Sequence, residues 1–355
     1  MAATANLPPL RGVIEGFYGT AWPTELRSLY ATWLAELGLN CYLYAPKADR
    51  YLRRAWTGHW PDGEWRLLRS LAEQHRKAGI TFGIGLSPFS LYADYSPVQR
   101  GRLQEKIERL NTLEAPFLAI LFDDMPGDQT DLAARQADIV ADCLAWSCAE
   151  RVAVCPTYYS SDPVLERVFG ARPRGYWRDL GAALPEQVDI FWTGDRVCAD
   201  ALHAAELDAI NAELRRPVTL WDNYPVNDGA ARSRHLYLEP PPMRDADNLR
   251  GVTRGHLCNG MNQPRLTLPA LAGLASLYDA SLDRHGWLAE TLGNATYASL
   301  QRDARLFRER DREQLLEHNG QALLQEYDAL ATPAAREVVA WLRGDYTFDP
   351  ACLTD

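Results

Sequence analysis

The sequence lacks the features that mark membrane, secreted and nucleic-acid-binding proteins. Nowhere in its 355 residues do about 20 consecutive apolar side chains occur, as a membrane-spanning helix requires. Residues 1–9 show no basic stretch followed by an apolar run, as a signal peptide would. The seven cysteines are an odd number without a CxxC pair, and a formal net charge of -10 disfavours nucleic acid and anionic membranes. We therefore expect a cytoplasmic protein with reduced thiols and neither kind of partner.

Motifs for cofactor and metal chemistry are also missing. No glycine-rich GxGxxG turn opens a helix after a strand, no GxSxG elbow occurs, and the histidines show neither HxH nor HExxH spacing. We therefore expect no cofactor and no zinc site. A magnesium site remains an alternative, although the loop at residues 126–132 has no basic side chain to bind a phosphate. The acidic cluster that could hold Mg²⁺ consists of Asp123, Asp124, Asp128 and Asp131.

Short β-rich runs alternate with longer amphipathic stretches along most of the chain, which indicates β-α units around a parallel sheet. Eight such units in about 265 residues match the usual size of a TIM barrel. A doubly wound open sheet is the rival, but its phosphate-binding turn is absent. We predict an α/β fold with a tail at 1–9, a TIM (β/α)8 barrel at 10–278 and a C-terminal helical region at 279–355. The predicted strands are 12–18, 41–45, 81–86, 117–122, 152–155, 188–192, 218–221 and 255–258, and the predicted helices include 24–39, 64–78, 97–113, 132–149 and 204–215.

The C-terminal region is rich in helix-forming residues and has no strand-like run. Its pattern predicts a helix over Leu300–Leu330 that is interrupted at Asn319–Gly320 and ends before Pro333. Charged amphipathic helices of this kind usually pack on a neighbouring domain or on a second copy of the chain. We expect them to cover the barrel or to form a homodimer.

Two neighbouring carboxylates, Asp123 and Asp124, close the apolar strand at 117–122. Side chains alternate along a strand, so both enter one cavity only if the backbone turns or bulges there. Two close carboxylates rarely ionise together, so one pKa should fall while the other rises, which gives one anion and one acid. By itself, such a pair caps a helix or is solvated about as often as it is functional.

Other predicted strand ends carry aromatic, amide and carboxylate side chains. Phe191–Gly194 closes one strand, Trp221–Tyr224 closes the next, and Asn227 and Asp228 follow. Aromatic faces stack on sugar rings, while fixed amides and carboxylates bond to hydroxyl groups. Because the carboxyl ends of barrel strands meet on one face, these residues together predict a carbohydrate site.

These segments together resemble glycoside hydrolase family 84, which comprises the O-GlcNAcases and their bacterial relatives. The chain departs from the family pattern at Ala48, where a second acidic residue is usual, at Tyr158, where glutamate is common, and at Gly260, where proline is common. The matching segments occur in family order and are Gly12–Gly19, Tyr44–Lys47, Phe122–Met125, Cys155–Tyr159, Trp192–Gly194, Trp221–Asn223 with Asp228, and Asn259.

The resemblance implies a TIM barrel that hydrolyses terminal β-linked N-acetylglucosamine with retention, the substrate's own acetamide acting as nucleophile. It implies that Asp123 accepts the acetamide N–H and stabilises an oxazoline intermediate, while Asp124 is the general acid and base. An N-acetylglucosamine-bearing glycoconjugate or glycoprotein is then the substrate; the alternative is a non-catalytic N-acetylglucosamine-binding protein on a degenerate barrel. The residues that match the acetamide pocket are Cys155, Tyr159, Thr193, Val197 and Trp221, and those that match the groups holding the sugar's polar edges are Gly16, Lys47, Asn223, Asp228 and Asn259.

Overall fold

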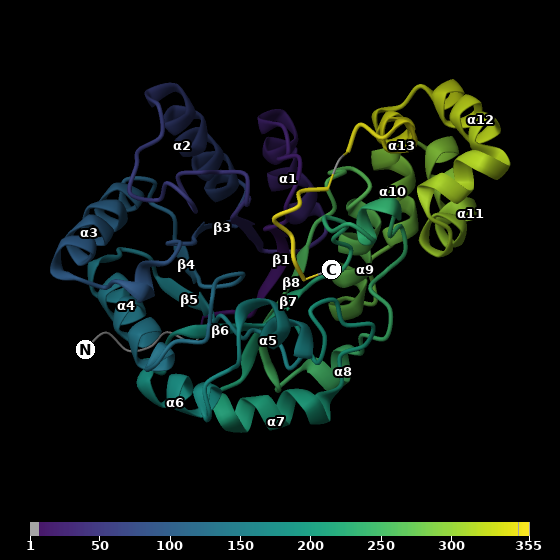
Figure 1. The fold of residues 1–355 in the computed structure, drawn as a ribbon. Coiled ribbons are helices and arrows are strands. Elements are labelled where there is room, and N and C mark those ends of the chain that lie inside the picture. Colours follow the sequence, from purple (N-terminus) through teal and green to yellow (C-terminus); the bar gives the residue numbers. More distant parts are fainter. Residues whose placement is uncertain (1–6, 347, 355) are drawn as a thin grey trace.

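Eight parallel strands form a closed barrel in chain order, with helices around the outside (Figure 1). The computed structural model describes residues 7–346 and 348–354. The predicted TIM barrel is confirmed, and each predicted strand overlaps an observed one. The strands are β1 (Leu10–Glu15), β2 (Cys41–Tyr44), β3 (Thr81–Leu86), β4 (Phe117–Leu121), β5 (Arg151–Cys155), β6 (Asp189–Trp192), β7 (Val218–Asp222) and β8 (Thr253–Asn259).

The strands are buried on both faces, which explains their continuous apolar runs. In β4 all five residues are buried, because one face meets the barrel interior and the other meets the helices. The predicted helices run past their observed C-terminal ends. The prediction of 24–39, for example, continues through Gly38, which lies at positive φ just after the helix has ended. The helices of the barrel are α1 (Thr24–Glu36), α2 (Asp62–Lys77), α3 (Pro97–Asn111), α4 (Leu132–Trp146), α5 (Pro163–Phe169), α6 (Tyr176–Ala183), α7 (Ala204–Leu214), α8 (Ala246–Leu249) and α9 (Leu268–Tyr278), with 3-10 turns at Leu91–Ala93 and Arg232–Arg234.

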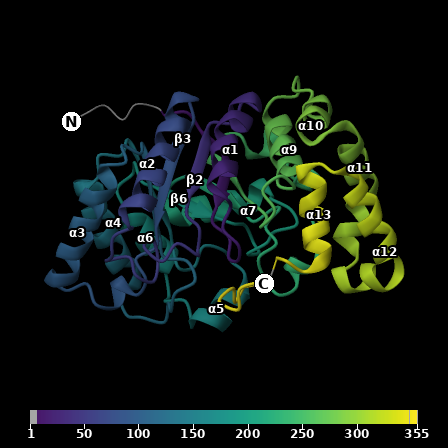
Figure 2. The same ribbon diagram turned by 90° about the horizontal axis from the view of Figure 1, so that it is seen from above.

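Four further helices form a lobe beside the barrel (Figure 2). They are α10 (Arg284–Leu292), α11 (Asn294–Glu309), α12 (Arg312–Leu330) and α13 (Pro333–Arg343). The predicted interruption at Asn319–Gly320 is wrong: the chain continues through Gly320 as helix and breaks at Asp311 instead. Asp311 accepts a hydrogen bond from the Gln314 backbone at 2.8 Å, and the Gln314 side chain accepts one from the Asp311 backbone at 3.2 Å. This capping box starts a new helix, and burial of Gly320 offsets its weak helix propensity.

Helix α13 is fastened to the loops at the carboxyl ends of β7 and β8. Buried Glu337 accepts the backbone N–H groups of Arg265 at 2.9 Å and Leu266 at 3.1 Å, and the Trp341 indole donates to the Ser233 carbonyl at 3.0 Å. The chain that leaves α13 therefore starts beside the mouth of the barrel, and Figure 1 shows it running in yellow across the middle of this face. Among the described residues, no helix has the length and apolarity needed to cross a bilayer.

Candidate active site

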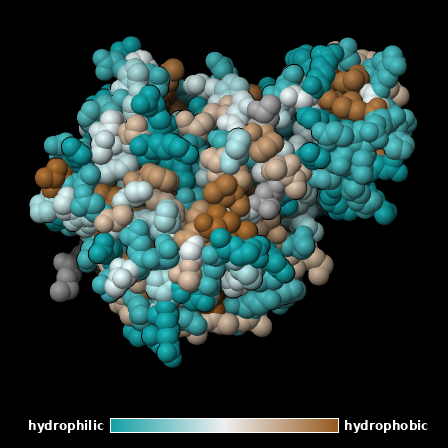
Figure 3. Space-filling view, viewed as in Figure 1, coloured by the Kyte–Doolittle hydropathy of each residue, from teal (hydrophilic) through white to brown (hydrophobic). Residues whose placement is uncertain are grey.

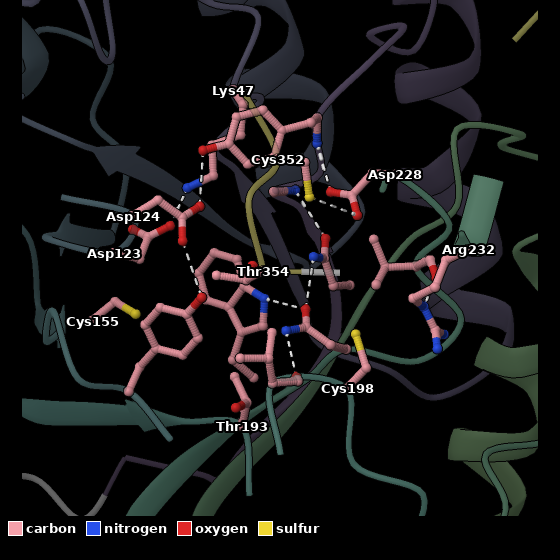
Figure 4. A pocket seen from close by; sticks show the side chains of 18 residues that line it. Lys47, Asp123, Asp124, Cys155, Thr193, Cys198, Asp228, Arg232, Cys352 and Thr354 are labelled. Atoms are coloured by element: carbon pink, nitrogen blue, oxygen red, sulfur yellow. Dashed lines mark hydrogen bonds and ion pairs between the residues drawn. The ribbon is translucent and has the colours of Figure 1, made fainter. Parts of the chain in front are cut away.

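A cavity of about 50 Å³ lies at the carboxyl ends of the barrel strands (Figure 4). The structure brings all twelve residues named from the sequence to its walls. They are Gly16, Lys47, Asp123, Asp124, Cys155, Tyr159, Thr193, Val197, Trp221, Asn223, Asp228 and Asn259. Sequence reasoning did not select six further lining residues, which are Tyr18, Cys198, Val226, Arg232, Cys352 and Thr354.

The backbone turns at the carboxylate pair. Asp124 has φ of 56°, in the left-handed region that non-glycine residues rarely adopt. This turn interrupts the alternation of the strand, so that Asp123 and Asp124 both line the cavity. Strain of this kind persists only where the surroundings hold it, and it gathers at functional sites.

Asp123 is held as an anion. It is buried, and its Oδ2 accepts a charged hydrogen bond from the Lys47 ammonium. Burial by itself would raise the pKa of Asp123, but Lys47 and Arg53 outweigh it and the pKa is lowered. The other oxygen, Oδ1, is buried and has no hydrogen-bond partner among the described residues. An anion with one unpaired oxygen at a cavity wall is a site for a donor from a ligand.

Asp124 has neutral partners instead. Its Oδ2 accepts the Tyr18 hydroxyl at 2.8 Å, and its Oδ1 accepts the Tyr159 hydroxyl at 3.0 Å. Within residues 7–346 and 348–354, no lysine or arginine side chain bonds to this carboxylate. The two neighbours therefore differ in chemistry because one faces a cation and the other faces phenols.

Arg53, which the sequence reasoning missed, supports the turn from behind. Its guanidinium is buried and donates to the Ser87 hydroxyl at 2.9 Å, to the Asp124 carbonyl at 3.2 Å and to the Tyr18 hydroxyl at 3.3 Å. It also reaches the Asp123 carbonyl at 3.5 Å. The only signal in the sequence was an arginine in the loop after a strand, nine residues beyond the end of β2, which is too common a feature to select.

Fixed amides line the opposite side of the cavity. Asn259 accepts the Gly16 N–H at 3.2 Å and donates to Asn223 Oδ1 at 3.0 Å, and Asn223 in turn donates to the Val197 carbonyl at 2.8 Å. The Trp221 indole also donates to Asn223 Oδ1, at 3.1 Å. A Cβ on Gly16 would lie 2.4 Å from the Trp221 ring, so glycine is required there. This series of hydrogen bonds fixes the orientation of both amides, and so decides whether each presents its oxygen or its N–H group to a ligand.

Asp228 stands beside these amides. Its Oδ2 accepts the Tyr18 backbone N–H at 2.8 Å, and its Oδ1 faces the Cys352 thiol at 3.9 Å. Burial is the main reason that the pKa of Asp228 is raised to about 6, and the nearby charge of Asp124 adds to it. Asp228 thus changes charge close to neutral pH.

The departures from the family pattern leave the cavity walls intact. Tyr158 points away from the cavity, where its hydroxyl donates to the Gly170 carbonyl at 2.7 Å. A Cβ on Gly260 would lie 2.6 Å from the Trp22 ring, so this close contact excludes any larger residue without a shift of the ring. Ala48 has no carboxylate that could pair with Lys47, and the Lys47 ammonium bonds to the Asp123 carboxylate instead.

The magnesium alternative is not supported, because the four aspartates at 123–131 do not gather their oxygens at one point. Among the described residues, the one cluster with metal-ligand side chains close together is Asp222, His256 and Cys258. There Asp222 already pairs with Arg244 at 2.7 Å and with His256 at 2.9 Å. The buried charge of Asp222 is thus compensated by side chains of the protein.

The sequence model of the β-N-acetylglucosaminidase family matches residues 11–299, which include both carboxylates and both sides of the cavity. The chain belongs to this family. It is 26% identical over 283 residues to the protein O-GlcNAcases of Mus musculus and Rattus norvegicus, a match that covers 77% of this chain and 30% of each relative. A mutant of the O-GlcNAc hydrolase of Thermobaculum terrenum superposes with a TM-score of 0.75 at 27% identity, covering 95% of this chain and 81% of that one. The chain thus spans about a third of the length of its mouse and rat relatives.

Proposed function

We propose that this protein is a retaining β-N-acetylglucosaminidase that removes terminal β-linked N-acetylglucosamine, with the substrate's acetamide oxygen as nucleophile. The observation that carries the proposal is the buried, unpaired Oδ1 of Asp123. An acetamide N–H would provide the missing donor. Because Lys47 keeps Asp123 ionised, the carboxylate then stabilises the positive charge that develops on the acetamide nitrogen as the oxazoline ring closes.

Asp124 is the general acid and base of this mechanism. A residue in this role must carry a proton to the glycosidic oxygen and later take one from water. Asp124 suits the role because its carboxylate is bonded to neutral phenols rather than to a fixed cation. Adjacent carboxylates suffice here, since an internal nucleophile removes the need for two carboxyl groups about 5–5.5 Å apart on either side of the sugar.

The remaining lining residues divide between the two ends of the sugar. Cys155, Val197 and Trp221 give an apolar pocket for the acetamide methyl, and burial raises the pKa of the Cys155 thiol, so that it stays neutral. Asn223, Asp228 and Asn259 offer oriented oxygens and N–H groups to the sugar hydroxyls. In this arrangement Thr193 and Tyr159 complete the acetamide pocket, while Lys47 and the Gly16 carbonyl belong to the polar edge.

We also propose a protein-borne substrate in the cytoplasm, supported by the similarity to mouse and rat proteins named protein O-GlcNAcase. The seven cysteines all lie among the described residues, where no two are joined as a disulfide, which suits a reducing compartment. Release of N-acetylglucosamine from a glycosylated peptide, compared with release from a free chitin fragment, separates a protein substrate from a glycan.

A homodimer through the C-terminal helices is a further part of the proposal. On α12, the apolar side chain of Leu316 is 40% exposed, so a substitution there tests this face without removing a fully buried side chain. Sedimentation velocity should show a dimer whose dissociation is promoted by Leu316→Lys. An unchanged monomer in both proteins would leave these helices as a cover for the barrel.

The mechanism is tested by fluorinating the acetamide of one aryl glycoside. Each fluorine withdraws electron density from the carbonyl oxygen, so the rate should fall steadily from N-acetyl to N-trifluoroacetyl substrates with the same leaving group. The first product should be the β-anomer. A rate indifferent to fluorination, or a carboxylate trapped as a glycosyl ester, would rule out the substrate-assisted mechanism. No turnover of any of these glycosides would favour the sugar-binding alternative.

A further inference from the structure

The segment that follows α13 enters the active-site cavity. Residues 349–352 form a turn in which the Cys352 N–H donates to the Asp349 carbonyl at 2.9 Å and the Ala351 N–H donates to the Asp349 side chain at 2.9 Å. Cys352, at the end of this turn, and Thr354 line the cavity, while Leu353 between them is 56% exposed (Figure 4). This alternation is that of an extended chain with one face toward the site.

Both inward side chains contact groups that the proposed mechanism needs. The Cys352 thiol lies 3.9 Å from Asp228 Oδ1, the oxygen that remains after the Tyr18 N–H has taken Oδ2. The Thr354 side chain hydrogen-bonds to Tyr159, whose hydroxyl donates to Asp124. The segment therefore contacts a residue proposed to bind the sugar hydroxyls through Cys352, and a residue bonded to the proposed general acid and base through Thr354.

The space that remains is too small for the substrate. The cavity measures about 50 Å³, whereas a cavity that binds benzene measures about 150 Å³. An N-acetylhexosamine is larger than benzene, so the segment occupies space that the sugar would need. The space-filling view shows apolar surface gathered at the middle of this face, where the segment runs, within a largely polar rim (Figure 3).

We propose that residues 348–354 are an internal ligand of the active site, which competes with the sugar for Asp228 and for the cavity. The inference rests on the proposed function only in naming that sugar. The described contact between Cys352 and Asp228 is one that a substrate can replace, because a thiol is a weak donor and sugar hydroxyls bond more strongly to the same oxygen. Competition of this kind makes the apparent Kd equal to the intrinsic Kd divided by the fraction of open molecules, so it weakens binding, and it leaves the chemical step unchanged.

The first test removes the segment. A chain that ends after Tyr346 keeps α13 and the contacts of Glu337 and Trp341, so its thermal unfolding should match that of the full chain. If nine-tenths of the molecules are closed, the KM for an aryl N-acetyl-β-glucosaminide should fall about tenfold on deletion while kcat stays the same. An unchanged or higher KM in a folded deletion variant would overturn the proposal.

The second test expels the segment without deleting it. Cys352→Asp places a carboxylate against Asp228 and should lower KM as the deletion does, because like charges repel at this short distance. Leu353→Asp is the matched control, since it adds the same charge one residue away on the exposed side and should leave KM unchanged. Equal effects of the two substitutions, or no effect of either, would contradict an inward-facing Cys352.

A binding measurement makes the outcome independent of turnover. The affinity of N-acetylglucosamine, measured by calorimetry, should rise about tenfold in the deletion variant relative to the full chain. If both chains hydrolyse the glycoside and neither affinity nor KM differs, the internal ligand is disproved and the proposed activity stands. If neither chain is active but the shortened chain binds the sugar more tightly, the activity is disproved and the internal ligand stands.

Discussion

The two walls of the cavity differ in the charges they carry and in the part of the reaction they serve. The carboxylate wall, formed by Lys47, Asp123 and Asp124 and supported from behind by Arg53, holds charges close together at a left-handed turn. The amide wall, formed by Asn223, Asp228 and Asn259, holds neutral amides in a hydrogen-bonded chain and one carboxyl whose pKa lies near neutrality. Charges that stabilise a transition state act on the chemical step, whereas fixed hydrogen bonds hold substrate and transition state alike. Changes in the carboxylate wall should therefore affect kcat, whereas changes in the amide wall should mainly raise KM and so lower kcat/KM.

The largest effect should come from Asp124→Asn on substrates with poor leaving groups. These need a proton on the departing oxygen, so kcat/KM should fall by about 100 to 10000-fold, while an activated aryl glycoside should be much less affected. Asp128→Asn is the matched control, because Asp128 lies in the same loop but is exposed outside the cavity. Equal losses for the two substrates would reject Asp124 as the acid.

Asp123→Asn should lower kcat by about 100 to 1000-fold, the scale seen when an electrostatic group aimed at the transition state is removed. In contrast to Asp124→Asn, the loss should persist with activated leaving groups, since the acetamide attacks in every case. Single-turnover rates on an aryl glycoside measure it. A loss confined to poor leaving groups would mean that the roles of the two carboxylates are exchanged.

Arg53→Met should lower kcat by about 100-fold, because it leaves two carbonyls of the carboxylate turn without a donor and a small displacement of catalytic groups is costly. Arg53 also helps to lower the pKa of Asp123, so the part of the acidic limb that Asp123 contributes, which lies at lower pH than that of Asp228, should move to higher pH. Arg53→Lys should restore part of both. Arg54→Met, the same change at the exposed neighbour, should alter neither. A stable Arg53→Met enzyme with normal kcat would make this arginine merely structural.

Asp228→Ala tests the amide wall. It should lower kcat/KM by an amount that corresponds to a loss of about 1 to 3 kcal/mol in binding free energy, since sugar hydroxyls would be buried without an acceptor. The loss should be similar for good and poor leaving groups, because binding precedes the choice of leaving group. Asp195→Ala, at an exposed position after β6, is the control. A loss that depends on the leaving group would place Asp228 with the carboxylate wall.

The smallest effect is a pH dependence. Because the pKa of Asp228 is raised to about 6, this carboxyl gains a proton as pH falls through that value and loses its strength as an acceptor. In the wild type kcat/KM should then fall by up to about tenfold for each pH unit below 6, and Asp228→Asn should remove this limb. Asp189→Asn is the comparison, since Asp189 is also buried with a raised pKa but begins β6, at the opposite end of the barrel. A limb that survives Asp228→Asn belongs to another group.

Local pattern was enough for the barrel and for most cavity residues. The apolar run that ends at Asp123 and Asp124 indicates a buried strand with charges at its carboxyl end, and in a barrel all such ends face one cavity. Pattern failed where a distant contact decides the outcome. Helix α12 continues through Gly320 because that residue is buried. It begins directly after Asp311 because the capping box formed by Asp311 and Gln314 stabilises a helix start there.

The sequence by itself determined the order of strands and helices, the place of the paired carboxylates and the aromatic and amide residues around them, because each depends on neighbours along the chain. Tertiary structure alone decided that Lys47 faces Asp123 while Tyr18 and Tyr159 face Asp124, with Arg53 behind both aspartates. It also decided that Cys352 and Thr354 lie in the same cavity. These contacts join residues that lie far apart in the sequence, and loop paths and the docking of α13 set them. Local periodicity carries no information about such contacts. The different surroundings of the two adjacent aspartates, one beside a cation and one beside phenols, therefore became visible only in the folded structure.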